Sequence, residues 1–200
     1  MIIKIFLILL LIVFPLGQLG RVSLGNGINF VPLDVMVFLT VLFWFLNQSF
    51  HKSFEKAKLK LPIILFIGIG FLSLVVNSIN LSFLDFISSF LYLVRFTSYA
   101  GIYFVLLDQN SSFQKKFKIG LLISGFAIII GGFIQYFLYP DLRNLRYLGW
   151  DEHLYRLFSS FLDPNFAGAF FVLELILITS LLFQKTRPTW QKYGLKVLGF

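Results

Sequence analysis

Long apolar runs, separated by short polar segments, set the pattern of this chain. Six of them approach the roughly 17–25 residues that cross about 30 Å of hydrocarbon as a helix. They cover residues 2 to about 16, about 30 to 50, about 59 to 76, about 84 to 107, 119 to 138 and 164 to 183. Apolar character resumes at residues 197–200, which we interpret as the opening of a truncated seventh helix. The pattern predicts an all-α, polytopic membrane protein in which residues 1–200 form a single transmembrane domain.

Composition supports this class and excludes others. Apolar residues make up 58% of the chain and charged residues 13%, whereas a soluble domain carries about 25% charged residues. A soluble enzyme, a disordered chain and a coiled coil are therefore excluded. The net charge of +8 does not indicate a nucleic-acid partner, because the basic residues lie between the apolar runs instead of on one face. With no cysteine and two histidines far apart, we expect no metal site and no cofactor.

The first run has two features of a signal peptide, a short basic start at Lys4 and an apolar core. Pro15 ends the run, and residues 17–21 (GQLGR) contain no cleavage site of the A-x-A type. A retained signal-anchor helix is therefore favoured over a cleaved signal peptide.

Lysine and arginine in the short loops predict the orientation of the helices. Twelve of the 17 basic residues fall inside when the N-terminus is cytoplasmic, in segments 1–4, 50–60, 108–118 and 184–196. The outer loops hold only arginines, namely Arg21, Arg143, Arg146 and Arg156. We therefore expect a multi-pass protein of the cytoplasmic (inner) membrane with its N-terminus inside.

Residues 140–163 form the longest predicted outer loop and the main candidate for chemistry. Loops of more than about 12–15 residues without structure of their own are often functional. Three of the four outer arginines lie here, and a guanidinium binds phosphate in bidentate fashion better than an ammonium does. Two plainer interpretations stay open. In the first, the arginines pair with Asp141, Asp151, Glu152 or Asp163. In the second, part of the loop forms a short interfacial helix with Trp150 and Tyr155 as anchors, because apolar residues recur at helical spacing at Leu154, Leu157, Phe158 and Phe161.

The sixth run has a clear start. Asp163 is a good N-cap and Pro164 is favoured at the first helical position, so we expect the helix to begin there. A helix N-terminus with free N–H groups favours phosphate. Asn165 is therefore a candidate residue of an anion site beside the arginine loop. A plain capped helix accounts for Asp163 and Pro164, but it does not account for Asn165.

Two charges within the apolar runs, Arg95 and Glu174, need an explanation. A charge in hydrocarbon costs several kcal/mol on insertion scales, so such residues normally face the protein interior and find partners. Both lie about ten residues, or roughly 15 Å, below the outer end of their helix. We predict an ion pair between them. A second interpretation places Arg95 in a cavity open to the outside, in contact with a lipid diphosphate.

The segment RLFSSFLDPNFAG, residues 156–168, resembles the R-x-x-S/G-x-F-x-x-P-N-x-x-A pattern of the O-antigen ligase and polymerase family. It departs from that pattern at Ala167, which falls one place early, so Gly168 takes the small-residue position. Residues 15–21 (PLGQLGR) through 32–34 (PLD) are also similar to members of this family, as are residues 92–96 (YLVRF) followed by Tyr99. The similarity covers most of the chain by arrangement, but only residues 156–168 form a motif.

The resemblance implies a membrane glycosyltransferase of envelope polysaccharide (lipopolysaccharide) biosynthesis. This chain would form the N-terminal half of a larger GT-C-like bundle. Such an enzyme transfers a glycan from undecaprenyl diphosphate to an acceptor outside the cytoplasmic membrane. Arginines bind the diphosphate, which here indicates Arg156 with Arg143 and Arg146, and no metal is needed. The catalytic histidine belongs to a later outer loop, so the catalytic residues are unknown here and this chain is expected to be inactive alone. His153 precedes the motif and is interpreted as an exposed loop residue.

Two other function classes stay open. A transporter or flippase for lipid-linked glycan intermediates also needs many helices and basic groups, but along an internal path. A structural membrane subunit without chemistry would pair Arg95 with Glu174 and leave no cavity open to the outside. The residues do not identify the sugar or the acceptor, and they do not separate a ligase from a polymerase.

Overall fold

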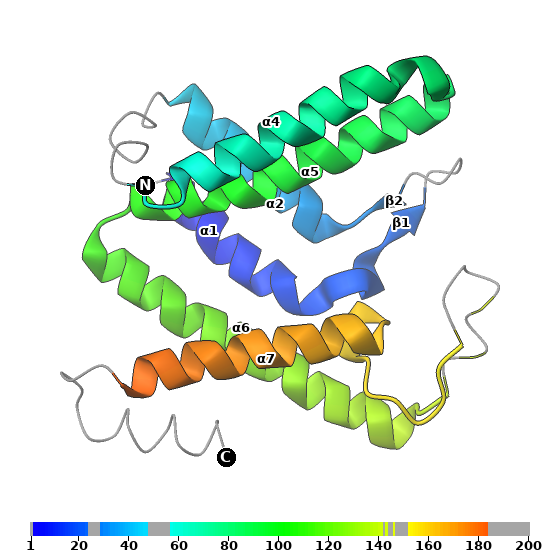
Figure 1. The fold of residues 1–200 in the computed structure, drawn as a ribbon. Coiled ribbons are helices and arrows are strands. Elements are labelled where there is room, and N and C mark those ends of the chain that lie inside the picture. The colour runs from blue at the N-terminus through cyan, green and yellow to red at the C-terminus, as the bar shows by residue number, and fades with distance from the viewer. Residues whose placement is uncertain are drawn as a thin grey trace. The chain divides into compact units, whose positions relative to one another are not determined.

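The computed structural model describes residues 2–23, 29–47, 57–141, 143, 146 and 152–183, and Figure 1 shows their fold. The α-helices are α1 (Ile2–Val13), α2 (Pro32–Leu46), α4 (Lys60–Asn77), α5 (Phe83–Leu107), α6 (Ser111–Leu138) and α7 (Pro164–Leu182). Short 3₁₀ segments are η1 (Phe14–Gly20), η2 (Ser78–Asn80) and η4 (Ser159–Phe161). The strands β1 (Val22–Ser23) and β2 (Asn29–Phe30) pair antiparallel. The predicted all-helical architecture is confirmed.

Most of these helices are suited to lipid. Within the described residues, five helical stretches are long and apolar enough to cross a membrane: Ile2–Gly20, Lys60–Asn80, Phe83–Leu107, Ser111–Leu138 and Pro164–Leu182. Many of their large apolar side chains are exposed, and water does not favour exposed apolar surface on this scale. The chain is a multi-pass membrane protein.

The second predicted span differs from the expectation. α2 has 15 residues, about 22 Å at 1.5 Å per residue, which is less than the roughly 30 Å of a hydrocarbon core. Its first helical residue is Pro32 and not Phe30, because Pro is favoured at the first position of a helix and Phe30 belongs to β2. The predicted end of this span at residues 48–50, and the predicted seventh helix at 197–200, lie outside the described residues.

The connection between α5 and α6 is shorter than the predicted inner segment 108–118. α6 begins at Ser111, because the side chain of Asn110 accepts a hydrogen bond from the backbone N–H of Phe113 at 2.9 Å. No glycine or proline interrupts the lysine-rich residues that follow. The prediction of a loop over 111–118 is therefore wrong, and these lysines lie on the first turns of α6.

Tertiary contacts group the described residues into two compact units, and each is described by itself. Unit 1 comprises residues within 1–13 and 20–117, and unit 2 comprises residues within 14–19 and 118–200. In unit 1, α1 packs on α2, α2 packs on α5, and α4 and α5 form a long antiparallel hairpin (Figure 1). Gly101 of α5 allows the close approach of α2, since a Cβ there would lie 2.8 Å from Cγ1 of Val41.

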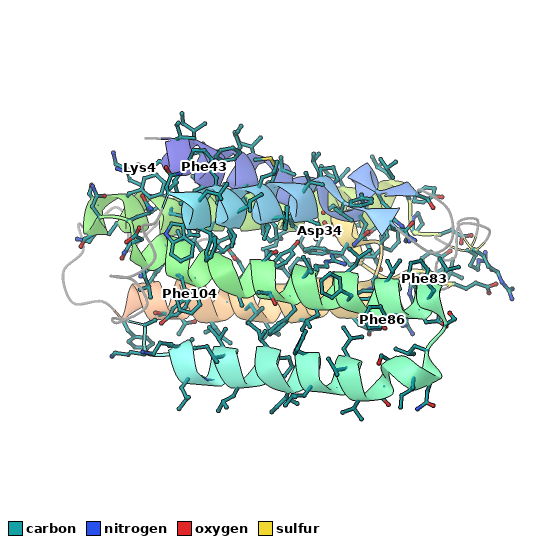
Figure 2. All side chains as sticks on the ribbon, turned by 90° about the horizontal axis from the view of Figure 1, so that it is seen from above. Lys4, Asp34, Phe43, Phe83, Phe86 and Phe104 are labelled. Atoms are coloured by element: carbon teal, nitrogen blue, oxygen red, sulfur yellow. The ribbon has the colours of Figure 1, made fainter. Side chains whose placement is uncertain are left out.

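The apolar core of unit 1 lies toward one end of its helices. It is built around Leu7, Trp44, Phe104 and Val105, all of them buried. Figure 2 shows Phe104 at the same end of the unit as Lys4 and Phe43, whereas Phe83 and Phe86 lie at the other end of α5. By the predicted orientation, the end with Lys4 is the cytoplasmic one.

Unit 2 is built on α6 and α7, which cross in Figure 1. Leu122 of α6 packs against Ile178 and Leu181 of α7. Toward the start of α7, the ring of Phe170 contacts Phe14 of η1, with ring centroids 5.5 Å apart. The unit therefore holds residues from the start and the end of the chain together.

Candidate functional site

A charged and hydroxyl-bearing cluster joins α2 and α5 in unit 1. Nε of Arg95 lies 2.9 Å from Oδ1 of Asp34 in an ion pair, and the hydroxyl of Tyr99 donates to the same oxygen at 2.7 Å. The guanidinium carbon of Arg95 also lies 5.9 Å from the centre of the Tyr99 ring, within the range of a cation–π contact. One carboxylate therefore holds an arginine and a tyrosine that lie one helical turn apart on α5.

This cluster lies within the span of α5. Arg95 is twelve residues after Phe83, the first residue of α5, which corresponds to about 18 Å along the helix axis. Figure 2 shows Asp34 set back from the end of the unit where Phe83 and Phe86 lie. The Asp34 side chain is 18% exposed, and that of Arg95 is 43% exposed. The guanidinium is therefore fixed by its carboxylate and still accessible to a further anion.

Sequence analysis missed Asp34 as the partner of Arg95, although a signal was present. Asp34 lies in the predicted second span, and a carboxylate there needs a partner for the same reason as Arg95 does. The predicted ion pair between Arg95 and Glu174 joins residues of the two units and stays a prediction. Within unit 2, the Glu174 side chain is buried and lies against Gly125 of α6.

The backbone of unit 2 is unusual at Tyr155 and within the segment of residues 156–168 that follows it. Tyr155, Ser159 and Leu162 adopt positive φ angles of 53°, 51° and 57°, which non-glycine residues rarely adopt. Asp141 and Leu154 form an antiparallel β-bridge, and the helical part of the described loop is the 3₁₀ turn Ser159–Phe161. The short helix expected in this loop is therefore limited to that turn. The φ of Tyr155 ends any helical path there, and Trp150 lies outside the described residues. Strained backbone of this kind clusters at functional sites.

Gln135 of α6 holds the segment in place. Its side-chain oxygen accepts hydrogen bonds from the backbone N–H of Phe158 at 3.0 Å and of Ser159 at 3.3 Å. Its amide nitrogen donates to the carbonyl of Arg156 at 3.4 Å. The hydroxyl of Ser159 donates to the carbonyl of Ile128 at 2.6 Å. Sequence reasoning missed Gln135, and the only signal was a polar residue near the end of an apolar span.

Gly17 of η1 lies directly against the same segment. Its φ is 50°, and a Cβ on it would lie 2.5 Å from the carbonyl oxygen of Ser160. Only glycine fits here, because both the backbone angle and the lack of space exclude a side chain. The hydroxyl of Ser160 is buried and has no hydrogen-bond partner within the described residues. Residues 14–19 and the segment of residues 156–168 therefore meet in unit 2.

The start of α7 confirms one prediction and weakens another. α7 begins at Pro164 with Asp163 as N-cap, as predicted. Oδ1 of Asp163 accepts from the backbone N–H groups of Asn165 at 2.7 Å and Phe166 at 3.2 Å. These N–H groups are therefore not free for phosphate, and the carboxylate puts a negative charge at the same place. The Asn165 side chain is exposed, so its predicted role in an anion site rests on that side chain alone.

The three loop arginines differ in their partners. Arg143 binds Asp141 through two parallel hydrogen bonds, Nε to Oδ1 at 3.0 Å and Nη2 to Oδ2 at 2.7 Å. Arg146 pairs with Glu152. Arg156 is exposed, and its side chain makes no ion pair with any residue that the structure describes. The interpretation that loop arginines pair with acids thus holds for two of the three, and Arg156 is the one left for another anion.

The pair of Asp141 and Arg143 has an electrostatic consequence. Hydrogen bonds from the Arg143 guanidinium lower the pKa of Asp141 from 3.8 to about 2. The same hydrogen bonds raise the pKa of Arg143. Both side chains are well exposed, so a stronger anion such as a diphosphate would compete with Asp141 for this arginine at little desolvation cost.

Among the described residues, no group of three or more histidine, cysteine, aspartate or glutamate side chains is placed to hold a metal ion. Comparison with protein-family models, curated proteins and solved structures finds no match to this chain. The resemblance stated above therefore rests on the residue patterns alone.

Proposed function

We propose that this chain takes part in the transfer of a glycan from undecaprenyl diphosphate to an acceptor outside the cytoplasmic membrane, as an enzyme of the O-antigen ligase or polymerase type. The carrying observation is that the segments similar to that family contact one another in pairs. Asp34 of residues 32–34 binds Arg95 and Tyr99, and Gly17 contacts Ser160 of the motif. Such pairing is expected of segments that are kept together by one function.

The proposed chemistry uses the arginines as the anion site. The acceptor hydroxyl oxygen bonds to the anomeric carbon of the glycan, and the bond from that carbon to the diphosphate oxygen breaks. Its electron pair stays on the diphosphate, and the hydroxyl proton passes to a base that is not identified. Arg156, without an acidic partner among the described residues, stabilises the charge that develops on the leaving group. The expected contact of Arg95 with the diphosphate stays a prediction. Arg143 and Arg146 become part of the anion site when the phosphate replaces their carboxylate partners, Asp141 and Glu152.

A groove in unit 1 offers room for part of a lipid chain. It lies between α2, α4 and α5, has a volume of about 610 Å³, and is lined mainly by apolar side chains that include Phe38, Ile64 and Phe90. The two hydroxyls in its lining, Thr97 and Ser98, donate to backbone carbonyls of their own helix at 2.8 Å each. Its surface is therefore effectively apolar, which suits a hydrocarbon chain next to the Arg95 cluster.

The test is a transfer assay with the full-length protein in phospholipid vesicles, because residues 1–200 alone are expected to be inactive. A synthetic polyprenyl-diphosphate glycan is supplied with candidate acceptors, and release of polyprenyl diphosphate and glycosylation of the acceptor are measured together. The proposal predicts that both appear in equal amounts and without added metal. A flippase would move the labelled lipid across the bilayer with the glycan–phosphate bond intact. That result, or no release with any acceptor, would contradict the proposal.

A further inference from the structure

Glu174 occupies a notch that one glycine creates. It lies in the middle of α7 and is only 4% exposed. It faces Gly125 of α6, where an added Cβ would lie 2.5 Å from both Cδ and Oε1 of the carboxyl group. No larger residue at position 125 leaves room for this carboxyl. The helix pair therefore accommodates Glu174 closely instead of leaving it at the edge of the bundle.

The two helices offer this carboxyl no counter-charge. Glu174 is the only ionisable residue of α7, and residues 119–135 of α6 contain no acidic or basic side chain. Residues 14–19 and Ser159–Phe161, the other helical parts of unit 2 among the described residues, contain none either. The nearest charges along these helices are Lys118, seven residues before Gly125, and Asp163, eleven residues before Glu174. They lie about 10 and 16 Å away along the helix axes. Within the described residues, no ion pair involves Glu174.

An ionised carboxylate in these surroundings is costly, because neither water nor a cation compensates for its burial. The neutral acid avoids most of that cost. We propose that Glu174 is a proton-binding site inside the membrane, held as a carboxylic acid at neutral pH in the notch made by Gly125. The proposal does not depend on the glycan-transfer function, and it excludes an ion pair between Glu174 and Arg95. Asp34 already supplies Arg95 with a carboxylate.

A protonated carboxyl within a bilayer has a specific chemical reactivity. A membrane-soluble carbodiimide, dicyclohexylcarbodiimide, adds to it without any further reagent. The acid proton moves to one carbodiimide nitrogen and a carboxyl oxygen bonds to the central carbon, which gives an O-acylisourea. The acyl group then migrates to nitrogen, so the residue gains the mass of one reagent molecule and nothing leaves. An ionised carboxylate bound to a guanidinium does not react in this way.

The experiment treats the protein in phospholipid vesicles with this reagent at pH 7 and locates the added mass by peptide mass spectrometry. The label is expected on Glu174 and not on Asp34, which is the matched carboxylate within the same membrane protein. Gly125→Ala should lower the labelling of Glu174 several-fold, because the new methyl group displaces the carboxyl. Gly131→Ala is the control on the same helix, since its Cβ meets only Oγ of Ser159 at an ordinary 3.8 Å.

Infrared spectroscopy of the protein in ester-free detergent decides the protonation state independently of reagent access. The difference between wild type and Glu174→Gln at pH 7 should contain the carbonyl band of a protonated carboxyl. If the substitution instead removes a carboxylate band, Glu174 is ionised in the wild type. That result would overturn the proposal regardless of the outcome of carbodiimide labelling. If Glu174→Gln does not fold, carbon-13 labelling of glutamate in the wild-type chain gives the same distinction.

Discussion

Arg95 of α5 and Asp34 of α2 meet with Nε and Oδ1 2.9 Å apart. The contact fixes how two membrane helices align. It places a carboxylate near the start of α2 beside an arginine that lies in the middle of α5.

Replacing Asp34 with Asn should destabilise the fold. The change keeps the shape and one oxygen for Tyr99 but leaves the Arg95 charge without a counter-ion. Since Arg95 is 43% exposed, we expect a loss of about 1–3 kcal/mol, between the costs of breaking a surface and a buried pair. Reversible unfolding in mixed detergent measures the loss.

Two further variants make this test specific. Asp85→Asn removes an exposed carboxylate at the start of α5, which bonds only Ser82 nearby, and should cost about 0.5 kcal/mol. Adding Arg95→Met to Asp34→Asn should recover part of the loss, because no charge is then stranded. Equal stability of Asp34→Asn and Asp85→Asn would show that the pair contributes nothing.

Gly17→Ala should disturb the segment of residues 156–168. The φ of 50° and the 2.5 Å approach of a Cβ to the Ser160 carbonyl oxygen both oppose the change. We expect a loss of at least about 2 kcal/mol in the free energy of unfolding. Gly68→Ala is the control, because nothing lies within 4 Å of its Cβ and alanine is the better helix former by about 1 kcal/mol. Similar stability of both variants would contradict the contact.

Gln135→Leu should loosen the motif while leaving α6 helical. Without the side-chain oxygen, the backbone N–H groups of Phe158 and Ser159 lose their acceptor, at about 1–3 kcal/mol for each buried donor left unpaired. Hydrogen exchange at these two amides should speed up markedly. Gln109→Leu, which removes a bond from Nε2 to the carbonyl of Val105 only, should leave them unchanged. Unchanged exchange in Gln135→Leu would refute the assigned role.

Local rules predicted much of the helical architecture. The start of α7 follows from Asp163 and Pro164 because an N-cap and a first-turn proline act through their own neighbours. The same rule, applied to Asn110, would have found the early start of α6. The loop prediction over residues 111–118 failed because charge was taken as a sign of a loop, although lysine is a good helix former.

The partner of Arg95 was not predictable by the argument used for it. Equal depth in the membrane restricts which residues are able to meet, but it does not determine which helices are neighbours. The neighbour of α5 that supplies the carboxylate is α2, and this pairing depends on packing such as that of Gly101 against Val41. The positive φ angles near Ser159 also depend on tertiary contacts, here with Gln135, and no local pattern indicates them.

The exposed pair of Asp141 and Arg143 gives a pH prediction. The folded pKa of Asp141, about 2, lies below its ordinary value of 3.8. The contribution of the pair to stability is therefore fully present above pH 3.8 and is lost as the pH falls through about 2. Carbon-13 NMR of the Asp141 carboxyl should show this low titration, and Arg143→Gln should return it to about 3.8. Titration near 3.8 in the wild type would refute the pair.

The claim at the centre of this account is that the arginines bind the diphosphate of a lipid-linked glycan. It is tested most directly by the rate of glycan transfer in Arg156→Lys, Arg156→Ala and, for comparison, Arg146→Lys, each as the complete protein in vesicles. Lysine keeps the charge but loses the two-pronged contact with phosphate, so Arg156→Lys should lower the rate about tenfold or more and Arg156→Ala further. Arg146→Lys, already paired with Glu152, should change it less. A wild-type rate in Arg156→Ala would contradict the account.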